Sequence, residues 1–156
     1  MAIFKHTQGA VSGGKRVTAT DVFTQNADGV IIEVDQPAGS ILEEVIVRFT
    51  NTSTHGSSSS AGYEIGTDSS GDQIGVNVNG FLDSGTSIPE NAVYYLNNGR
   101  GAAGWTGDTL NDGASPTAAA AYTDVNRTVY LTFKHGNTAV TTNSNVEVNF
   151  IFTHLN

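Results

Sequence analysis

Apolar and polar residues alternate along several stretches of the chain, a pattern typical of β-strands that bury one face. The clearest stretch is 41–51, in which Val45, Val47 and Phe49 would share one face. The apolar positions there do not repeat every three or four residues, which argues against an amphipathic helix. We therefore expect residues 41–51 to form a core strand.

Two further stretches with the same alternation lie near the end of the sequence, at 127–134 and 145–154. Both are rich in β-branched and aromatic residues, which are enriched in strands. Their inward-facing positions are expected to be Val129, Leu131, Phe133, Val146, Val148, Phe150 and Phe152.

Shorter apolar stretches separated by turn residues complete the expected sheets. Residues 17–24 and 30–35 flank an Asn-Ala-Asp-Gly turn and are expected to pair as a hairpin. The serine-rich stretch 52–60 reads as a polar loop. Further short strands are expected at 62–67, 74–78 and 92–96. About eight strands at fairly even spacing predict an all-β, antiparallel β-sandwich of jelly-roll-like topology, with a closed barrel as the alternative.

Two segments lack strand patterning. Residues 1–16 are polar and glycine-rich, so we expect an N-terminal arm without regular structure. Residues 97–124 form a long glycine-rich loop around the only tryptophan, Trp105, and 117–122 could begin one helical turn. The expected organisation is an arm, 1–16, followed by a single sandwich domain, 17–156.

Charge and composition narrow the function classes. The net charge is -8 and only 14% of the 156 residues are charged. Nucleic acids require a positive binding surface, so they are not expected partners. No window approaches the ~20 apolar residues of a membrane span, and the start of the chain does not resemble a signal peptide. Three of the seven basic residues nevertheless gather near the N-terminus, at Lys5, Lys15 and Arg16.

Residues able to support catalysis or metal binding are present but do not form a recognisable pattern. The chain has no cysteine and no G-x-S-x-G nucleophile motif. The four histidines, at positions 6, 55, 135 and 154, are not spaced as metal ligands and are expected to be solvated near turns. The acidic turn 68–72 could bind calcium, although Asx turns explain the same residues. We therefore expect no catalytic residue, metal or cofactor.

Four stretches of the sequence form a recognisable set: the run QPAGSILEEVIV at 36–47, YEIGT at 63–67 with the Gly71-Asp72 turn, and the closing stretches 128–133 and 146–152. In these stretches the sequence resembles the small structural virion proteins of tailed bacteriophages, of the capsid decoration or cement type. The resemblance implies a structural protein without enzymatic activity, made in the host cytoplasm and bound to the outer capsid surface. Its implied partners are the major capsid protein of the same virion and further copies of itself, in a trimer. A small tail or fibre component is less consistent with the likeness.

This role assigns tasks to particular residues. In the arm, Ile3 and Phe4 would serve as apolar anchors, with Lys5, Lys15 and Arg16 as charge partners for an acidic shell; a disordered tail is the alternative. Apolar residues opposite the main core set would cover subunit contacts, or would be buried under a second sheet or a crossing loop. These residues are Ile31, Ile46 and Ile151.

The alternative function is a carbohydrate-binding or adhesin-like module. Aromatic rings that stack on sugars would come from the 97–124 loop and its surroundings, namely Tyr94, Tyr95, Trp105 and Tyr122. A single tryptophan in such a loop can equally anchor the loop to the domain.

Overall fold

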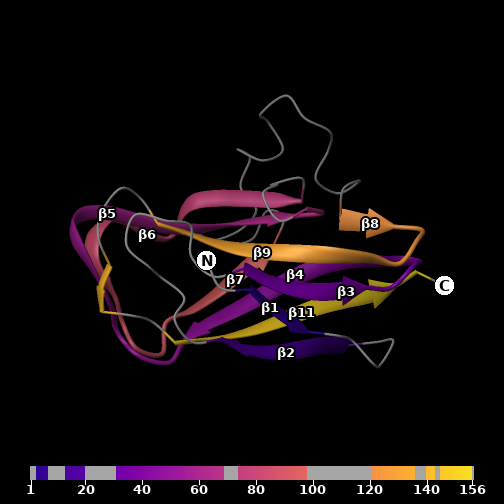
Figure 1. Ribbon diagram of the computed structural model, residues 1–156, viewed down its shortest axis with the longest axis horizontal. Helices are drawn as coiled ribbons and strands as arrows, with labels where there is room; N and C mark the ends of the chain where they lie inside the picture. The colour runs from indigo at the N-terminus through magenta and orange to yellow at the C-terminus, as the bar shows by residue number, and fades with distance from the viewer. Residues whose placement is uncertain are drawn as a thin grey trace.

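The computed structural model describes residues 3–6, 13–19, 31–68, 74–97, 121–135, 140–142 and 145–155. These residues form two β-sheets that pack face to face (Figure 1), which confirms the predicted all-β sandwich. The described part of the chain contains eleven strands, where the sequence pattern suggested about eight.

The first sheet has the order β1-β3-β9-β5-β10, and β6 also pairs with β5. Its strands are β1 (Ile3–His6), β3 (Ile31–Gln36), β9 (Arg127–His135), β5 (Ser53–Gly66), β10 (Val140–Thr142) and β6 (Gly75–Ile88). Strand β1 runs parallel to β3, whereas the other pairs are antiparallel.

The second sheet is antiparallel and has the order β2-β11-β4-β7, with the short strand β8 also paired to β4. Its strands are β2 (Gly13–Ala19), β11 (Val146–His154), β4 (Ser40–Phe49), β7 (Val93–Asn97) and β8 (Tyr122–Thr123). Strands β7 and β8 therefore lie along the same side of β4.

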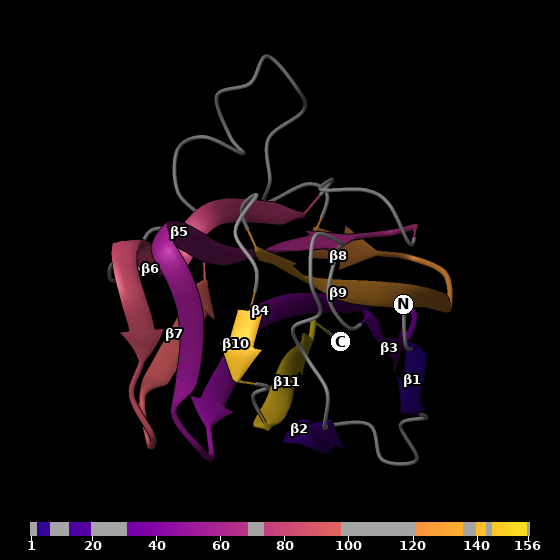
Figure 2. The ribbon, with the colours of Figure 1, turned by 60° about the vertical axis from the view of Figure 1, so that its left-hand side comes forward.

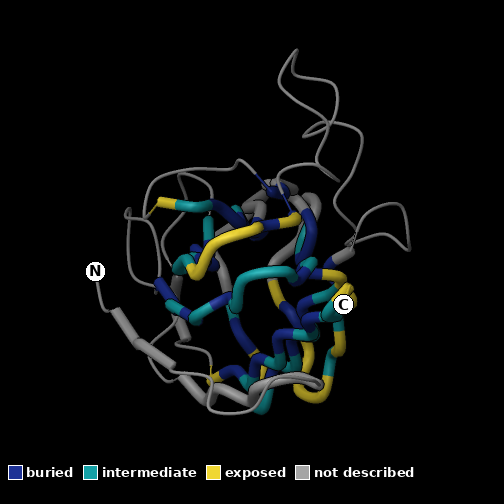
Figure 3. Tube along the Cα trace, turned by 90° about the vertical axis from the view of Figure 1, so that its right-hand side faces the viewer, coloured by how far each residue is buried: buried dark blue, intermediate teal, exposed yellow. Residues whose placement is uncertain are grey.

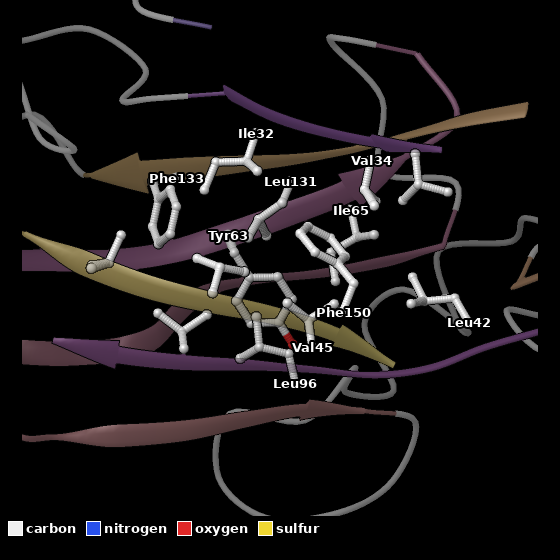
Figure 4. Packing of buried hydrophobic residues seen from close by; sticks show 14 of the residues in the cluster. Ile32, Val34, Leu42, Val45, Tyr63, Ile65, Leu96, Leu131, Phe133 and Phe150 are labelled. Atoms are coloured by element: carbon white, nitrogen blue, oxygen red, sulfur yellow. The ribbon is translucent and has the colours of Figure 1, made fainter. Parts of the chain in front are cut away.

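The core lies between the sheets and follows the alternation read from the sequence. On β4, Val45, Val47 and Phe49 are fully buried, as predicted. The predicted inward residues of β9 and β11 are also buried. Figure 4 shows Leu131 and Phe133 approaching the core from one sheet, and Val45 and Phe150 from the other. Along the trace in Figure 3, buried and partly exposed residues alternate, as one-sided burial of a strand requires.

Aromatic side chains form the central cluster of this core. Phe81 of β6 lies 5.0 Å from Tyr94 and 5.4 Å from Phe49 between ring centroids, both in edge-on geometry. Its ring also contacts Tyr63 at 5.6 Å and Phe133 at 5.7 Å. The sequence pattern placed a strand only at 74–78, so it missed the residue that joins these rings.

Three local predictions are wrong. The segments 17–24 and 30–35 do not form a hairpin, because β2 pairs with β11 in the second sheet and β3 pairs with β9 in the first. Residues 3–6 and 13–19 form strands, so the N-terminal segment is not free of regular structure. In the serine-rich stretch 52–60, expected to be a polar loop, residues 53–60 belong to β5, whose pairing to β9, β6 and β10 outweighs the low strand preference of serine.

Strands β5 and β6 bend along their length (Figure 2). Their pairing contains several register shifts, between Thr54 and Ser59, between Ser59 and Ser60, and between Ala61 and Tyr63. Bulges of this kind increase strand twist and bending. The bend lets β5 pair with β9 through residues 61–66 and with β10 through Thr54 and His55.

The Pro37–Gly39 turn carries the chain from the first sheet to the second. Gly39 has a φ of 75°, a conformation that costs a residue with a Cβ roughly 1 kcal/mol or more. The amide of Gly39 donates to the carbonyl of Thr123 at 2.8 Å, and the amide of Ala38 donates to Asn126 Oδ1 at 2.9 Å. The turn thereby holds β8 against the start of β4.

Candidate interaction surface

The outer face of the second sheet brings together residues from three strands. In an antiparallel sheet, residues directly opposite each other point to the same side. One row across the sheet contains Val93, Arg48 and Glu147, and the next contains Tyr95, Ile46 and Asn149. A third row contains Glu44 and Ile151.

An ion pair stands in the first of these rows. Arg48 donates from Nε and Nη2 to Glu147 Oε2, at 3.0 Å and 2.8 Å, and from Nη1 to Asn91 Oδ1 at 2.8 Å. The guanidinium is therefore fixed between β11 and the turn that precedes β7. Both charged side chains remain partly exposed, so the pair is worth only ~0.2–1 kcal/mol to stability and chiefly defines the shape and charge of the surface.

A shallow hollow of about 280 Å³ lies beside this pair. It is lined by Ile46, Arg48, Val93, Glu147, Val148 and Asn149. The lining combines apolar side chains with one fixed ion pair and contains neither a nucleophilic hydroxyl nor a histidine. Such a hollow suits contact with another protein surface better than chemistry on a small substrate.

The sequence analysis expected Ile31, Ile46 and Ile151 to lie opposite the main core set, and the structure places two of these three residues on the outer face. Ile46 and Ile151 lie partly exposed on the outer face, as their alternation predicted. Ile31 is 1% exposed, so of the two alternatives burial within the chain holds for this residue. Val93 and Tyr95, at 43% and 53% exposed, form the more accessible part of the face.

The basic and apolar N-terminal residues lie on strands at the ends of the two sheets. Ile3, Phe4 and Lys5 belong to β1, which pairs with β3, while Lys15 and Arg16 belong to β2, which pairs with β11. Their backbone registers are defined, and their side chains are outside the described part of the structure.

The aromatic residues proposed for sugar stacking do not share one surface. Tyr94 points into the core, where its hydroxyl donates to the carbonyl of Phe81 at 2.8 Å and burial raises its pKa. Tyr95 lies on the opposite face of β7, and Tyr122 is exposed on β8. Trp105 and residues 98–120 lie outside the described residues. At the ends of the predicted 97–124 loop, Asn97 belongs to β7 and Tyr122 to β8, so the loop is shorter than expected and the possible helical turn at 117–122 does not extend to Tyr122.

A buried polar network lies where β3 ends. The fully buried Gln36 donates from Nε2 to the carbonyls of Ser40 and Ala121, at 3.1 Å and 2.8 Å. Arg127 Nε donates to Gln36 Oε1 at 2.9 Å, and burial lowers the pKa of Arg127. The side-chain amide of Gln36 therefore ties the start of β8 to both sheets.

Metal-binding geometry is not found in the described ranges. No group of three or more His, Cys, Asp or Glu side chains there could hold a metal ion. Asp68 is exposed, while the remainder of the proposed calcium turn, 69–72, lies outside those ranges. Nε2 of His154 is buried without a hydrogen-bond partner, so the expectation of a solvated histidine is wrong for His154. No helix in the described residues is long and apolar enough to cross a membrane.

The described residues thus form a two-layer β-protein. Its outer face, with exposed apolar side chains beside the Arg48–Glu147 ion pair, has the character of a binding surface. No protein family matches the sequence, and no curated protein is similar to it. Among solved structures, the chain is similar to one from the "Capsid of Ralstonia phage GP4", with a TM-score of 0.50 and 12% sequence identity. The alignment covers 99% of both chains, and at this identity it establishes a shared fold.

Proposed function

We propose that this chain is a structural protein of a bacteriophage particle, and more specifically a decoration or cement protein bound to the outer surface of the head. The observation that carries the proposal is the full-length likeness to a chain of a phage capsid, which covers 99% of each chain. Because coverage is equal on both sides, the two chains are nearly equal in length. The likeness therefore extends over nearly the full length of both chains, as expected for a small accessory subunit.

The architecture suits a cement protein, which acts by binding. The two-sheet core supplies a rigid body, and the outer face of the second sheet offers apolar side chains beside a fixed ion pair. With only 14% charged residues, the chain can approach neighbouring subunits with little charge to desolvate. The partner in this proposal is the major capsid protein of the same particle.

Attachment through the basic N-terminal strands is part of the proposal. Strands β1 and β2 stand at the ends of their sheets and carry Lys5, Lys15 and Arg16, three of the seven basic residues in a chain of net charge -8. A deletion of residues 1–15 would remove β1 and part of β2, so its effect on the fold would be mixed with its effect on binding. Point substitutions of the charges are the cleaner perturbation.

The test is co-sedimentation with heads of the phage that encodes this chain, assembled without it. The wild-type protein should bind to saturation and should bind less at high salt, because exposed ion pairs are screened. Absence of co-sedimentation at low salt would refute the proposed function. The double variant Lys5→Gln with Arg16→Gln should bind more weakly than the wild type.

A matched control separates a local effect from one of net charge. Ser87→Glu with Val125→Glu changes the net charge by the same two units, at residues that are exposed. If the control weakens binding as much as the Lys5 and Arg16 double variant does, attachment through β1 and β2 is wrong, although head binding itself would stand.

A further inference from the structure

Strand β1 is held in the first sheet by one partner strand. Among the described strands, β1 pairs only with β3, in parallel register from Ile3 opposite Ile31 to His6 opposite Val34, and it lies beside β3 in Figure 2. A parallel pair is not joined by a tight hairpin turn, and residues 7–30 separate these two strands in the sequence. The edge of β3 therefore binds a short extended segment from elsewhere in the chain, as in β-strand addition.

The edge of β3 is held in place by contacts other than those with β1. On its other side, β3 pairs with β9 along all six of its residues. Its inward side chains Ile32 and Val34 are fully buried in the core, and the side chain of Gln36 is fixed by hydrogen bonds at the end of the strand. The binding edge is thus formed by a firmly held strand, whereas its occupant β1 has a single partner strand.

The connection from β1 to β2 is long compared with the separation of the two strands. Strand β1 lies in the first sheet and β2 in the second, and the two approach within 8 Å between Cα atoms. The chain from His6 to Gly13 reaches roughly 23–25 Å when extended. Gly9 lies in this connection and has access to more backbone conformations than a residue with a Cβ. The length of chain therefore allows β1 to reach the β3 edge of its own chain or that of a copy beside it.

We propose that the edge of β3 also accepts β1 of a second copy of this chain, in the same parallel register, so that two copies exchange their β1 strands reciprocally. Because the same four residues occupy the same edge, the exchanged pair keeps the β1–β3 ladder of the single chain. Exchange of an identical element is a low-cost route to dimers. This contact goes beyond the proposed role on the phage head and does not depend on it.

The concentration of neighbouring copies determines how much exchange occurs. A short connection holds β1 near its own β3 at an effective concentration on the order of 1 mM. Exchange should therefore be negligible in micromolar solution and should involve a large share of the chains at about 1 mM. Copies held side by side on a surface meet the second condition.

The test uses disulfides, because the chain has no cysteine of its own. Lys5 and Glu33 are Cα partners across the β1–β3 pair, and neighbouring strands lie about 4.7–4.9 Å apart, within the range that a disulfide spans. Chains with Lys5→Cys and chains with Glu33→Cys are unfolded together in urea, refolded at about 1 mM and oxidised. An affinity tag on the Glu33→Cys chain identifies the mixed product. A disulfide between the two kinds of chain should form at about 1 mM and should fall at least tenfold at about 10 μM.

Two controls make the result specific. Lys5→Cys with Glu33→Cys in one chain should form an internal disulfide in micromolar solution, which checks the register of β1. Lys5→Cys mixed with Glu90→Cys, a glutamate exposed outside β3, gives the background from chance collision. A mixed Lys5–Glu33 product no greater than this background, or failure of the internal disulfide, would overturn the proposal. Co-sedimentation with heads is measured separately, so failure of this exchange is distinguishable from failure of the proposed function.

Discussion

Replacing Phe81 by alanine tests the packing that joins the two sheets. The side chain is 4% exposed, and its ring lies within 5.7 Å of the rings of Phe49, Tyr63, Tyr94 and Phe133 between centroids. Truncation of a buried phenylalanine costs about 3–5 kcal/mol, from the lost burial and the cavity left behind. The hydrogen bond from the Tyr94 hydroxyl survives in principle, because its acceptor is the backbone carbonyl of residue 81.

This cost is a large part of the ~5–15 kcal/mol by which a domain is stable. For a chain of this length it corresponds to a fall in Tm of about 6–20 °C, at ~2–4 °C for each kcal/mol. Urea unfolding followed by tryptophan fluorescence and circular dichroism measures the change. The control is Leu155→Ala, whose side chain is 58% exposed and should change stability by no more than ~0.5 kcal/mol. A loss below ~1 kcal/mol for Phe81→Ala, with an unchanged dependence on urea, would refute the packing described for β6.

Three further predictions concern polar groups. A double-mutant cycle on Arg48 and Glu147 should give a coupling free energy of unfolding of ~0.2–1 kcal/mol, which decreases as salt is added. A larger coupling that does not depend on salt would contradict the partly exposed geometry of the pair. Gln36→Leu should cost about 1–3 kcal/mol in urea unfolding, because the buried carbonyl of Ala121 loses its donor; a neutral result would show that this network does not hold β8. Burial raises the pKa of Tyr94 above the ordinary 10.0, so its contribution is complete below pH 10 and is lost as pH rises toward the folded-state pKa. Tyr94→Phe should therefore lose stability less steeply above pH 10 than the wild type, and identical pH profiles would exclude this contribution.

The strands with strict alternation were predictable from sequence because their pattern reports one-sided burial. This holds for β4, β9 and β11, whose inward residues are buried as expected. The second half of β5 was expected as a strand at 62–67, but its first half was missed. The Ser57–Ser60 stretch carries no burial signal, and its strand form depends on pairing with distant segments. The expected hairpin at 17–35 failed for a related reason, since a turn signal is local and the choice of partner strand is not.

The interaction surface was predictable only in outline. Alternation placed Ile46 and Ile151 on the outer face, but the same argument placed Ile31 there, which the rest of the chain buries. The position of β7 at the end of the second sheet, among the described strands, could not be identified from sequence, because it is a property of sheet order. Likewise, the sequence does not distinguish the two neighbouring tyrosines of β7. Tyr94 faces the core because it is in register with the buried Val47, whereas Tyr95 is in register with Ile46 on the outer face.

The position of β11 in the second sheet has a consequence for biosynthesis. This strand lies between β2 and β4, so Ala19 meets Val146, and Val146 also meets Phe49. During translation, β2 and β4 leave the ribosome long before their common neighbour exists. Until β11 emerges, β4 presents an unpaired edge and an uncovered apolar face, the features that favour aggregation of nascent chains. Long-range pairing of this kind also slows folding. The synthesis of β11 therefore determines when β4 is paired on both sides, and so when the newly made protein is protected from aggregation with other nascent chains on the same polysome.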